Sequence, residues 1–227
     1  MICIIQARIG STRLKKKLLK NIGGHTIIEW VIKRAKKIKG VDLVVLAIPK
    51  SNKQIKLVKI AKKIKCEIFQ GSEKNLVNRF YYVLKKYNHK DFIRICADNP
   101  FICHKEIDHL IKFYKKNKYD YVYNYGPVNS SYPDGIGAEI SNLITLSKIK
   151  KLAKSKSEQE HLFEIIKKYP KKFKKSSLEP KDKFFKKPFL KLDIDYQEQL
   201  SFFNKVNLKI DMNTKKIINQ ILKFNEN

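Results

Sequence analysis

The stretch that decides the fold is Met1-Ile-Cys-Ile-Ile-Gln-Ala7, followed at once by Arg8-Ile-Gly-Ser-Thr-Arg-Leu14. The first segment is apolar and rich in isoleucine, which predicts a buried strand. The second combines a glycine, two hydroxyl side chains and two arginines, which predicts a polar loop. A buried strand that ends in such a loop is typical of a parallel sheet, whose ligands bind beyond the carboxyl ends of its strands.

The rest of the chain repeats the alternation of strand and helix. Apolar, β-branched segments predict further strands at Leu43–Ile48, Glu67–Phe69, Phe92–Ala97, Tyr121–Asn124 and Phe189–Ile194. Amphipathic segments predict helices near residues 26–38, 53–64, 74–87 and 104–117, and a closing helix that Asn213 caps. This alternation predicts an α/β fold with a mostly parallel central sheet and helices on both faces.

The chain has no convincing linker and no internal repeat, so we expect residues 1–227 to form one domain. Residues 171–187 are rich in Lys, Ser and Pro and are predicted to form a loop. No apolar run approaches the roughly 20 residues that a membrane-spanning helix needs. The first apolar segment lacks the basic residues that begin a signal peptide, so we expect a cytoplasmic protein without a membrane span.

The cysteines and the net charge limit which classes of function are possible. Cys3, Cys66, Cys96 and Cys103 show no CxxC spacing, which favours buried free thiols over a zinc site.

The formal net charge of +29 raises the hypothesis of a basic nucleic-acid-binding protein. However, 45 of the 50 basic residues are lysines spread over nearly every predicted helix, as on solvated helix faces. No aromatic–basic RNA motif or helix-turn-helix is present, and we expect no specific nucleic-acid partner.

Arginine is rare in this chain, so its placement is informative. Arginine offers a planar fork for two-point contact with phosphate, which lysine cannot copy. The five arginines are Arg8, Arg13, Arg34, Arg79 and Arg94. Two of them lie in the loop after the first strand, whereas Arg34 is expected on an ordinary, solvent-facing side of a helix.

The first loop has the residue types that a triphosphate site needs. It combines a glycine for a tight turn, hydroxyl and backbone N–H groups, and positive charge, in Gly10, Ser11, Thr12, Arg8, Arg13 and Lys17. The Walker pattern GxxxxGK[ST] and the dinucleotide pattern GxGxxG are both absent. From these residues alone, a basic surface loop is an equally good interpretation.

Carboxylates occur in two later segments. Asp98 follows a predicted strand in Arg94-Ile-Cys-Ala-Asp-Asn-Pro100, and Asp193 and Asp195 lie two residues apart in the last predicted strand. Residues two apart in a strand face the same side. Such carboxylates can hold Mg²⁺ against phosphates. A turn at Asp98 and an exposed edge strand would also account for them.

Several segments, in order along the chain, resemble one family. Ile4–Leu14 is close to the signature IIQARxGSTRL, Asn21–Val31 is similar to GGxPxxEWV, and Phe69–Tyr81 is similar to GSExxVLxRYY. Later matches are Arg94–Pro100, Tyr132–Gly135, Glu160–His161 and Ile194–Glu198. The chain resembles the cytidylyltransferases of the spore-coat polysaccharide biosynthesis type, which are related to the acylneuraminate and 3-deoxy-manno-octulosonate cytidylyltransferases.

The resemblance implies a glycosyltransferase-A-like nucleotidyltransferase fold and a homodimer. It implies transfer of CMP from CTP to a sugar acid or similar small acidic acceptor, with Mg²⁺ and release of pyrophosphate. Asp98 and Asp195 would bind the metal, and Arg8, Arg13 and Lys17 would act on the leaving pyrophosphate. The expected nucleotide-binding residues are Ala7, Arg8, Gly10, Ser11, Thr12, Arg13, Lys17 and Arg79. Asp193 is a candidate for a further metal ligand or a base.

The chain departs from the family pattern at several positions. The family's Pro-Gly pair before Lys17 is Lys15-Lys16, and the family's aspartate after the TYPDG-like segment is Gly137. Gln159 replaces an arginine before Glu160, and Gln197 replaces a proline. Gly137 and Gln159 lie in the half expected to bind the acceptor, which leaves a nonulosonic acid, a 3-deoxy sugar acid, a sugar phosphate or a phosphonate open. Transfer of another nucleotide such as GMP, or nucleotide binding without catalysis, are the alternatives.

Overall fold

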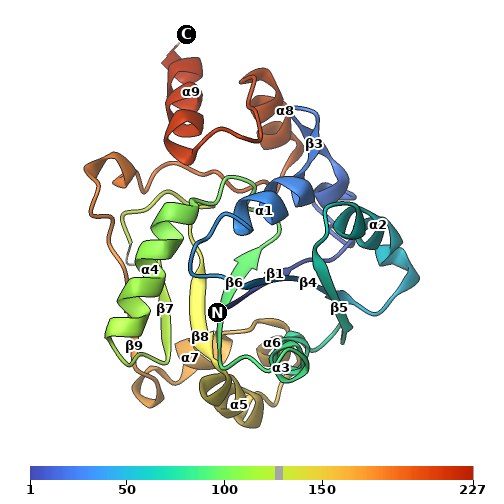
Figure 1. Cartoon of the computed structure of the whole chain (residues 1–227), viewed down its shortest axis with the longest axis vertical. Helices are drawn as coiled ribbons and strands as arrows, with labels where there is room; N and C mark the ends of the chain where they lie inside the picture. Colours follow the sequence, from blue (N-terminus) through green and yellow to red (C-terminus); the bar gives the residue numbers. More distant parts are fainter. Residues whose placement is uncertain (126–129, 227) are drawn as a thin grey trace.

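A seven-stranded sheet forms the centre of the computed structural model, which describes residues 1–125 and 130–226 (Figure 1). The strand order is β5-β4-β1-β6-β8-β7-β9. The strands are β1 (Ile2–Gln6), β4 (Leu43–Pro49), β5 (Glu67–Gly71), β6 (Asp91–Cys96), β7 (Tyr121–Tyr123), β8 (Glu139–Asn142) and β9 (Lys175–Ser177). Only β8 runs antiparallel to its neighbours in this sheet, which confirms the expected α/β fold with a mostly parallel sheet.

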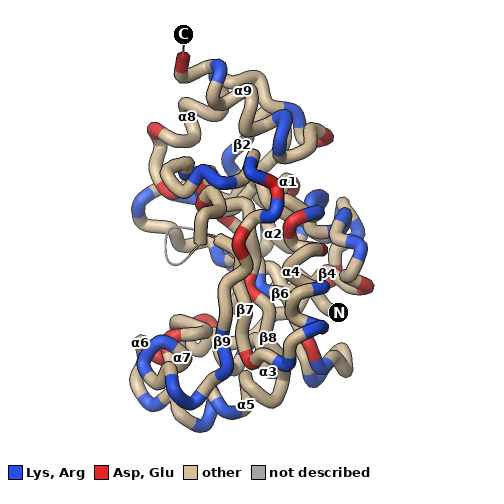
Figure 2. Tube along the Cα trace, turned by 90° about the vertical axis from the view of Figure 1, so that its left-hand side faces the viewer, with Lys and Arg blue, Asp and Glu red and all other residues tan. Residues whose placement is uncertain are grey.

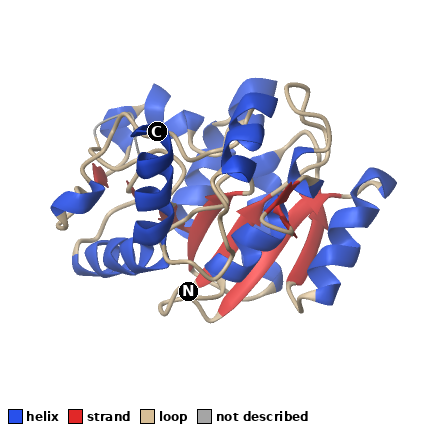
Figure 3. Cartoon of the chain, turned by 90° about the horizontal axis from the view of Figure 1, so that it is seen from above, coloured by secondary structure: helices blue, strands red, loops and turns tan. Residues whose placement is uncertain are grey.

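Helices cover both faces of the sheet (Figure 3). One face carries α1 (Ile27–Ala35), α2 (Ile55–Lys63) and α4 (His104–Lys116), with α8 (Gln197–Lys205) and α9 (Thr214–Glu226) in the same core. The other carries α3 (Leu76–Lys86), α5 (Leu143–Leu152), α6 (Lys156–Glu160) and α7 (Glu164–Lys168). A hairpin of β2 (Asn21–Ile22) and β3 (His25–Thr26) precedes α1, and the 3₁₀ turns are η1 (Lys17–Leu19), η2 (Asn52–Gln54), η3 (Pro170–Lys172) and η4 (Lys183–Phe185).

Strand β1 shows why a continuous apolar run produces this arrangement. Cys3 and Ile5 pack into the core that contains α1, whereas Ile2 and Ile4 pack into the core that contains α3. Successive side chains of a strand point to opposite faces, so a strand covered on both faces is apolar at every position. Full burial of one such aliphatic side chain contributes about 1.5–3 kcal/mol.

Polar residues mark the helix starts that the sequence predicts. Thr26 and Glu29 form a capping box at the start of α1, and the Asn75 side chain accepts a hydrogen bond from Asn78 N at the start of α3. Asn213 Oδ1 accepts from Lys216 N at 3.0 Å, which confirms the capped closing helix. These contacts satisfy backbone N–H groups that the first helical turn leaves without partners.

The strand predicted at Phe189–Ile194 does not form, and this prediction is wrong. The segment has no ladder, and it makes separate backbone hydrogen bonds, from Leu192 N to Asp134 O and from Ile194 N to Asp98 O, each at 3.0 Å. Conversely, strand β8 was not expected. The predicted loop at residues 171–187 contains β9 and η4, and η3 overlaps its start. The alternation Leu190, Leu192, Ile194 reflects burial of these side chains without pairing in a strand.

Arg34 is not on a solvent-facing side of its helix, which corrects a second expectation. It is 1% exposed. Its Nε donates to Ile102 O at 2.9 Å, its Nη1 to Met212 O at 2.7 Å and its Nη2 to Thr214 Oγ1 at 2.5 Å. Arg34 therefore ties α1 to the segment after β6 and to the start of α9. The helical pattern predicted a solvent-exposed Arg34 because its side chain is charged. A guanidinium group can nevertheless be buried when it donates hydrogen bonds to several acceptors at once.

The basic residues occur along most of the chain and do not gather on one element (Figure 2). This distribution fits the interpretation of solvated helix faces. In the described ranges, no helix is long and apolar enough to cross a membrane.

Candidate active site

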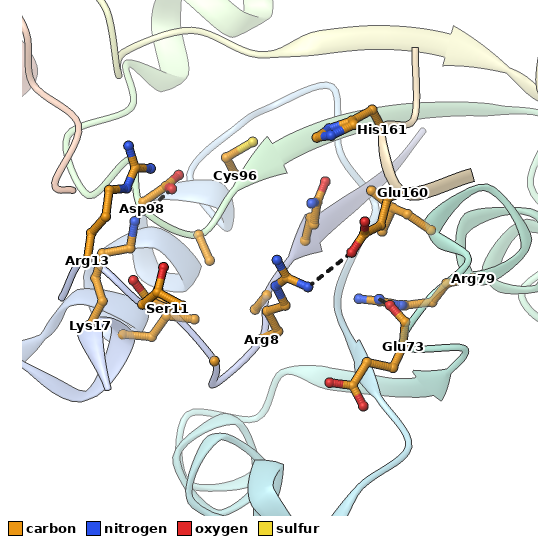
Figure 4. A pocket seen from close by; sticks show the side chains of 17 residues that line it. Arg8, Ser11, Arg13, Lys17, Glu73, Arg79, Cys96, Asp98, Glu160 and His161 are labelled. Atoms are coloured by element: carbon orange, nitrogen blue, oxygen red, sulfur yellow. Dashed lines mark hydrogen bonds and ion pairs between the residues drawn. The ribbon is translucent and has the colours of Figure 1, made fainter. Parts of the chain in front are cut away.

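Two adjoining cavities lie at the carboxyl ends of β1 and β6. The first has a volume of about 430 Å³ and is bordered by the loop after β1, the start of α3, the end of β6 and the end of α6 (Figure 4). The second has a volume of about 260 Å³ and shares Cys96 and Asp98 with the first. The first cavity brings together all the residues expected to bind the nucleotide, Ala7, Arg8, Gly10, Ser11, Thr12, Arg13, Lys17 and Arg79.

The loop after β1 is fixed by hydrogen bonds to its backbone. Ile9 N donates to Gln54 Oε1 at 2.8 Å, and Leu14 N donates to Ser11 Oγ at 3.4 Å. Gly10 was expected to permit a tight turn, but its φ is not positive and a Cβ atom there would meet nothing within 4 Å. The turn therefore does not need a glycine at this position. The missing side chain leaves the backbone of Gly10 open to the cavity.

Lys17 lies between the two carboxylates expected to bind metal. Its Nζ is 2.9 Å from Asp98 Oδ2 and 2.8 Å from Asp195 Oδ1, and its side chain is 9% exposed. Burial alone lowers the pKa of Lys17, but the ion pairs with Asp98 and Asp195 outweigh burial and raise the pKa above its ordinary value. The ammonium group is therefore charged and holds the carboxylates together.

Lys15-Lys16 replaces the Pro-Gly pair of the family pattern, and this replacement affects the backbone conformation before Lys17. Lys16 has a φ of 55°, in the left-handed region, just before η1 begins at Lys17. Glycine, which the family pattern has here, enters this region without steric cost, whereas other residues lose about 1–2 kcal/mol. The loop keeps the conformation that a glycine would favour, and Lys17 still reaches Asp98 and Asp195.

Hydrogen bonds from distant segments position Asp98 and Asp195. Ile194 N donates to Asp98 O at 3.0 Å, which brings the residue before Asp195 against the end of β6. Asp195 N donates to Gln199 Oε1 at 2.7 Å, in the first turn of α8. Arg13 Nη2 is 2.6 Å from Asp195 Oδ2, and the Arg13 guanidinium lies 5.2 Å from the centre of the Tyr196 ring. Asp195 does not border either cavity, but it bonds to two residues that do.

This pair of carboxylates has the chemistry of a magnesium site. Asp98 and Asp195 converge on one cation, the Lys17 ammonium group. Mg²⁺ is usually bound through one or two carboxylates together with substrate phosphates. Residues 1–125 and 130–226 contain no group of three or more His, Cys, Asp or Glu that could hold a metal ion, so phosphate oxygens would have to complete the coordination. The two aspartates fit a site of that kind.

Two arginines lie at the other end of the first cavity. Arg79 is buried, and its guanidinium donates to three backbone carbonyls, those of Ala47, Ser72 and Glu73. Burial, together with the nearby charge of Arg8, lowers the pKa of Arg79 to about 10. Arg8 is 55% exposed and lies 3.5 Å from Glu160 Oε1. The positive charges of Arg8 and Arg79 repel each other, and an anion bound at this end of the first cavity would relieve that repulsion. The hydrogen bonds of Arg79 also hold the turn that contains Glu73.

Cys96 borders both cavities, which the sequence did not predict. Cys3, Cys66 and Cys103 are buried free thiols as expected, but Cys96 is partly exposed. Burial raises the pKa of the Cys96 thiol to about 12, although the neighbouring Arg94 charge opposes this shift. The thiol is therefore protonated near neutral pH, which argues against a role as a nucleophile.

The second cavity brings Asp134 next to Asp193. Gly135 has a φ of 85°, and a Cβ atom there would meet Asp193 N at 2.5 Å, so only glycine allows this close approach. Burial raises the pKa of Asp193 to about 6, and the charges of Asp134, Asp195 and Asp98 act in the same direction. Asp193 was expected to share one face of a strand with Asp195. Without that strand, Asp193 borders the second cavity and Asp195 contacts Lys17.

Tyr125 and Asp134, which also line the second cavity, were not expected as site residues. The signal for Asp134 was present in Tyr132-Pro-Asp-Gly135, where a turn-forming glycine follows an aspartate. Nothing in the sequence pattern points to Tyr125, since its place depends on Glu139 Oε1, which accepts a hydrogen bond from Tyr125 OH at 3.1 Å.

Comparison with known proteins identifies relatives along nearly the whole chain. Residues 2–218 match a family described as cytidylyltransferase. The spore coat polysaccharide biosynthesis protein SpsF of Bacillus subtilis is 30% identical over 228 residues, which cover 95% of this chain and 91% of that protein.

Solved structures with the same fold include a cytidylyltransferase from Leptospira borgpetersenii serovar Hardjo-bovis. It has a TM-score of 0.89 and 26% identity, and the match covers 99% of this chain and 95% of that one. CMP:2-keto-3-deoxy-manno-octonic acid synthetase, complexed with CTP, has a TM-score of 0.66 and 16% identity, with 91% and 96% covered. The second likeness shows the shared fold alone.

Proposed function

The chain belongs to the cytidylyltransferase family, and we propose that it transfers CMP from CTP to a hydroxyl group of a sugar acid or related small acceptor, with Mg²⁺ and release of pyrophosphate. One observation carries the proposal. Arg8, Arg13 and Lys17 meet Asp98 in the same cavity, with Asp195 in contact with Lys17. A set of cations next to two converging carboxylates suits a triphosphate and its metal ion.

The two cavities suggest how the reactants are arranged. The nucleotide occupies the first cavity and the acceptor occupies the second, so that they meet beside Asp98, which both cavities share. The acceptor oxygen attacks the α-phosphorus of CTP, and pyrophosphate leaves. Holding the two reactants in this geometry removes much of the entropic barrier to their encounter.

The chain's own residues supply charge stabilisation. Arg8 and Arg13 are exposed over about half of their side chains, and each forms an ion pair through one nitrogen, with Glu160 and Asp195 respectively, so their other N–H groups can bind phosphate oxygens. Lys17 presents a charged ammonium group at the same wall. Such fixed cations stabilise the negative charge that develops on the leaving pyrophosphate. Mg²⁺, held by Asp98 and Asp195, would act as a Lewis acid on the phosphate and acceptor oxygens.

Replacing each aspartate of the pair tests this assignment. Asp98→Asn and Asp195→Asn should each lower kcat by at least about 10²-fold, because each removes a fixed charge from the metal site. EDTA should abolish turnover of the native enzyme. Asp211→Asn, at an exposed position that borders neither cavity, is the matched control and should keep full activity. Full activity of both site variants, or of the native enzyme in EDTA, would refute the two-aspartate assignment.

A further inference from the structure

Cations already engage both oxygens of the Asp195 carboxylate. Lys17 Nζ lies 2.8 Å from Asp195 Oδ1, and Arg13 Nη2 lies 2.6 Å from Asp195 Oδ2. Lys17 Nζ also lies 2.9 Å from Asp98 Oδ2 (Figure 4). Of the residues that the structure describes, Lys17 alone contacts both carboxylates. Its ammonium group therefore lies where the two aspartates converge, which is the position that they would offer to a metal ion.

The Lys17 ammonium group and Mg²⁺ would compete for this position. Mg²⁺ needs its oxygen ligands at about 2.0–2.1 Å in a nearly octahedral arrangement. Lys17 Nζ contacts the two oxygens, Asp98 Oδ2 and Asp195 Oδ1, that would supply such ligands. The charges act in the same direction, because the two carboxylates already face two cations, Lys17 and Arg13. A divalent ion added to this neutral set would lie close to two positive charges, which is unfavourable in a partly buried site.

Lys17 can reach another set of partners in the first cavity. It lines that cavity together with Arg8 and Arg13, which are proposed to bind the triphosphate. The backbone of Lys17 is held in place, because its N–H donates to Leu14 O at 3.1 Å and its carbonyl accepts from Lys20 N at 3.0 Å. The flexible four-carbon stem lets the ammonium group move while the backbone stays. Because the side chain is largely buried, the ammonium group needs an anion as its new partner.

The following step rests on the proposed function. We infer that Lys17 occupies the metal site of the free enzyme and leaves it when the nucleotide binds. Lys17 then exchanges Asp98 and Asp195 for phosphate oxygens, and the two carboxylates become available to Mg²⁺. The enzyme accordingly binds the metal ion together with the triphosphate and not before it. One lysine thus serves first as the counter-ion of the carboxylates and then as a counter-ion of the phosphates.

Binding of Mn²⁺ to the nucleotide-free enzyme tests this inference. Mn²⁺ replaces Mg²⁺ in the titration because electron paramagnetic resonance measures its free concentration. Lys17→Met and Lys17→Gln both remove the charge, and the glutamine keeps a hydrogen-bond donor for the aspartates. Each variant should bind Mn²⁺ at least about tenfold more tightly than the native enzyme. Lys17→Arg, which keeps the charge, and Lys20→Met, at an exposed position of the same segment, should bind Mn²⁺ as weakly as the native enzyme.

A further substitution locates the site at which Mn²⁺ binds. Asp195→Asn added to Lys17→Met should abolish the gain in affinity, because the gain depends on the pair of carboxylates. The native enzyme provides a test that needs no variant, since it should bind Mn²⁺ more tightly with the α,β-methylene analogue of CTP than without nucleotide. Equal Mn²⁺ affinity of the native enzyme in both conditions would overturn the inference.

The same titrations separate this inference from the proposed function. Failure of the native enzyme to bind the CTP analogue in the presence of Mn²⁺ would contradict the proposed function itself. Normal binding of the analogue, together with equal Mn²⁺ affinities of the nucleotide-free native enzyme, Lys17→Met and Lys17→Gln, would overturn only the inference that Lys17 occupies the metal site.

Discussion

Substitution of Arg34 by lysine should destabilise the fold strongly, although it conserves the charge. The Arg34 guanidinium makes three hydrogen bonds from three different nitrogen atoms, to Ile102 O, Met212 O and Thr214 Oγ1. Burial lowers the pKa of Arg34 to about 10, and in the described ranges no carboxylate lies within ion-pair distance of it. A lysine ammonium is a single point on a flexible stem and cannot match the spacing of this fork.

The magnitude follows from the acceptors that lose their donor. If the lysine satisfies one of the three, two buried acceptors remain unpaired, and each unpaired buried group costs about 1–3 kcal/mol. The free energy of unfolding should therefore fall by about 2–6 kcal/mol. For a chain of this length, the melting temperature should fall by roughly 4–24 °C.

Urea unfolding followed by circular dichroism measures this change, with an unaltered m-value as the sign that the native and unfolded states are otherwise the same. The kcat/KM of the folded variant for CTP should match the native value, because Arg34 borders neither cavity. A free energy of unfolding within about 0.5 kcal/mol of the native value would show that these hydrogen bonds do not hold α1, the segment after β6 and the start of α9 together.

Three further predictions concern the nucleotide and the partners. Arg13→Lys keeps the charge but loses two-point contact with phosphate, so kcat/KM for CTP should fall roughly 10- to 100-fold with little change in melting temperature; native steady-state kinetics would contradict this. We expect a homodimer, and a 26.7 kDa monomer in size-exclusion chromatography with light scattering would reject it. DNA binding should be weak, independent of sequence and lost by physiological salt, whereas a nanomolar, sequence-selective complex would favour the nucleic-acid hypothesis.

The parallel half of the fold could be predicted because its strands are buried on both faces. β1 and β4 are apolar at nearly every position, and β6 carries the apolar residues Phe92, Ile93 and Ile95, which is a strong local signal. β9, Lys175–Ser177, has no apolar residue, and β8 opens with Glu139, whose burial depends on Arg94 and Tyr121. These strands exist because of pairing with distant segments, so no local pattern could reveal them.

The candidate site, like the fold, could be predicted from the sequence only in part. The loop from Arg8 to Lys17 is contiguous, and its residue types alone made phosphate binding as good an interpretation as a basic surface loop. The position of Asp195 against Asp98 depends on the hydrogen bond from Ile194 N to Asp98 O, which joins segments far apart in the sequence. The spacing made both Asp193 and Asp195 candidate metal ligands, and the choice of Asp195 came from the family resemblance. The place of Asp193 in the second cavity could not be predicted, because it follows from an irregular segment packed against Gly135.

Pyrophosphate release with each of the four nucleoside triphosphates tests the central claim most directly. The assay contains Mg²⁺ and a panel of acceptors, namely nonulosonic acids, 3-deoxy sugar acids, sugar phosphates and phosphonates. We predict release that requires both CTP and an acceptor, with kcat/KM for CTP at least about tenfold above that for ATP, GTP or UTP. No release with CTP across the panel, or faster release with another triphosphate, would contradict the proposal that this enzyme transfers CMP.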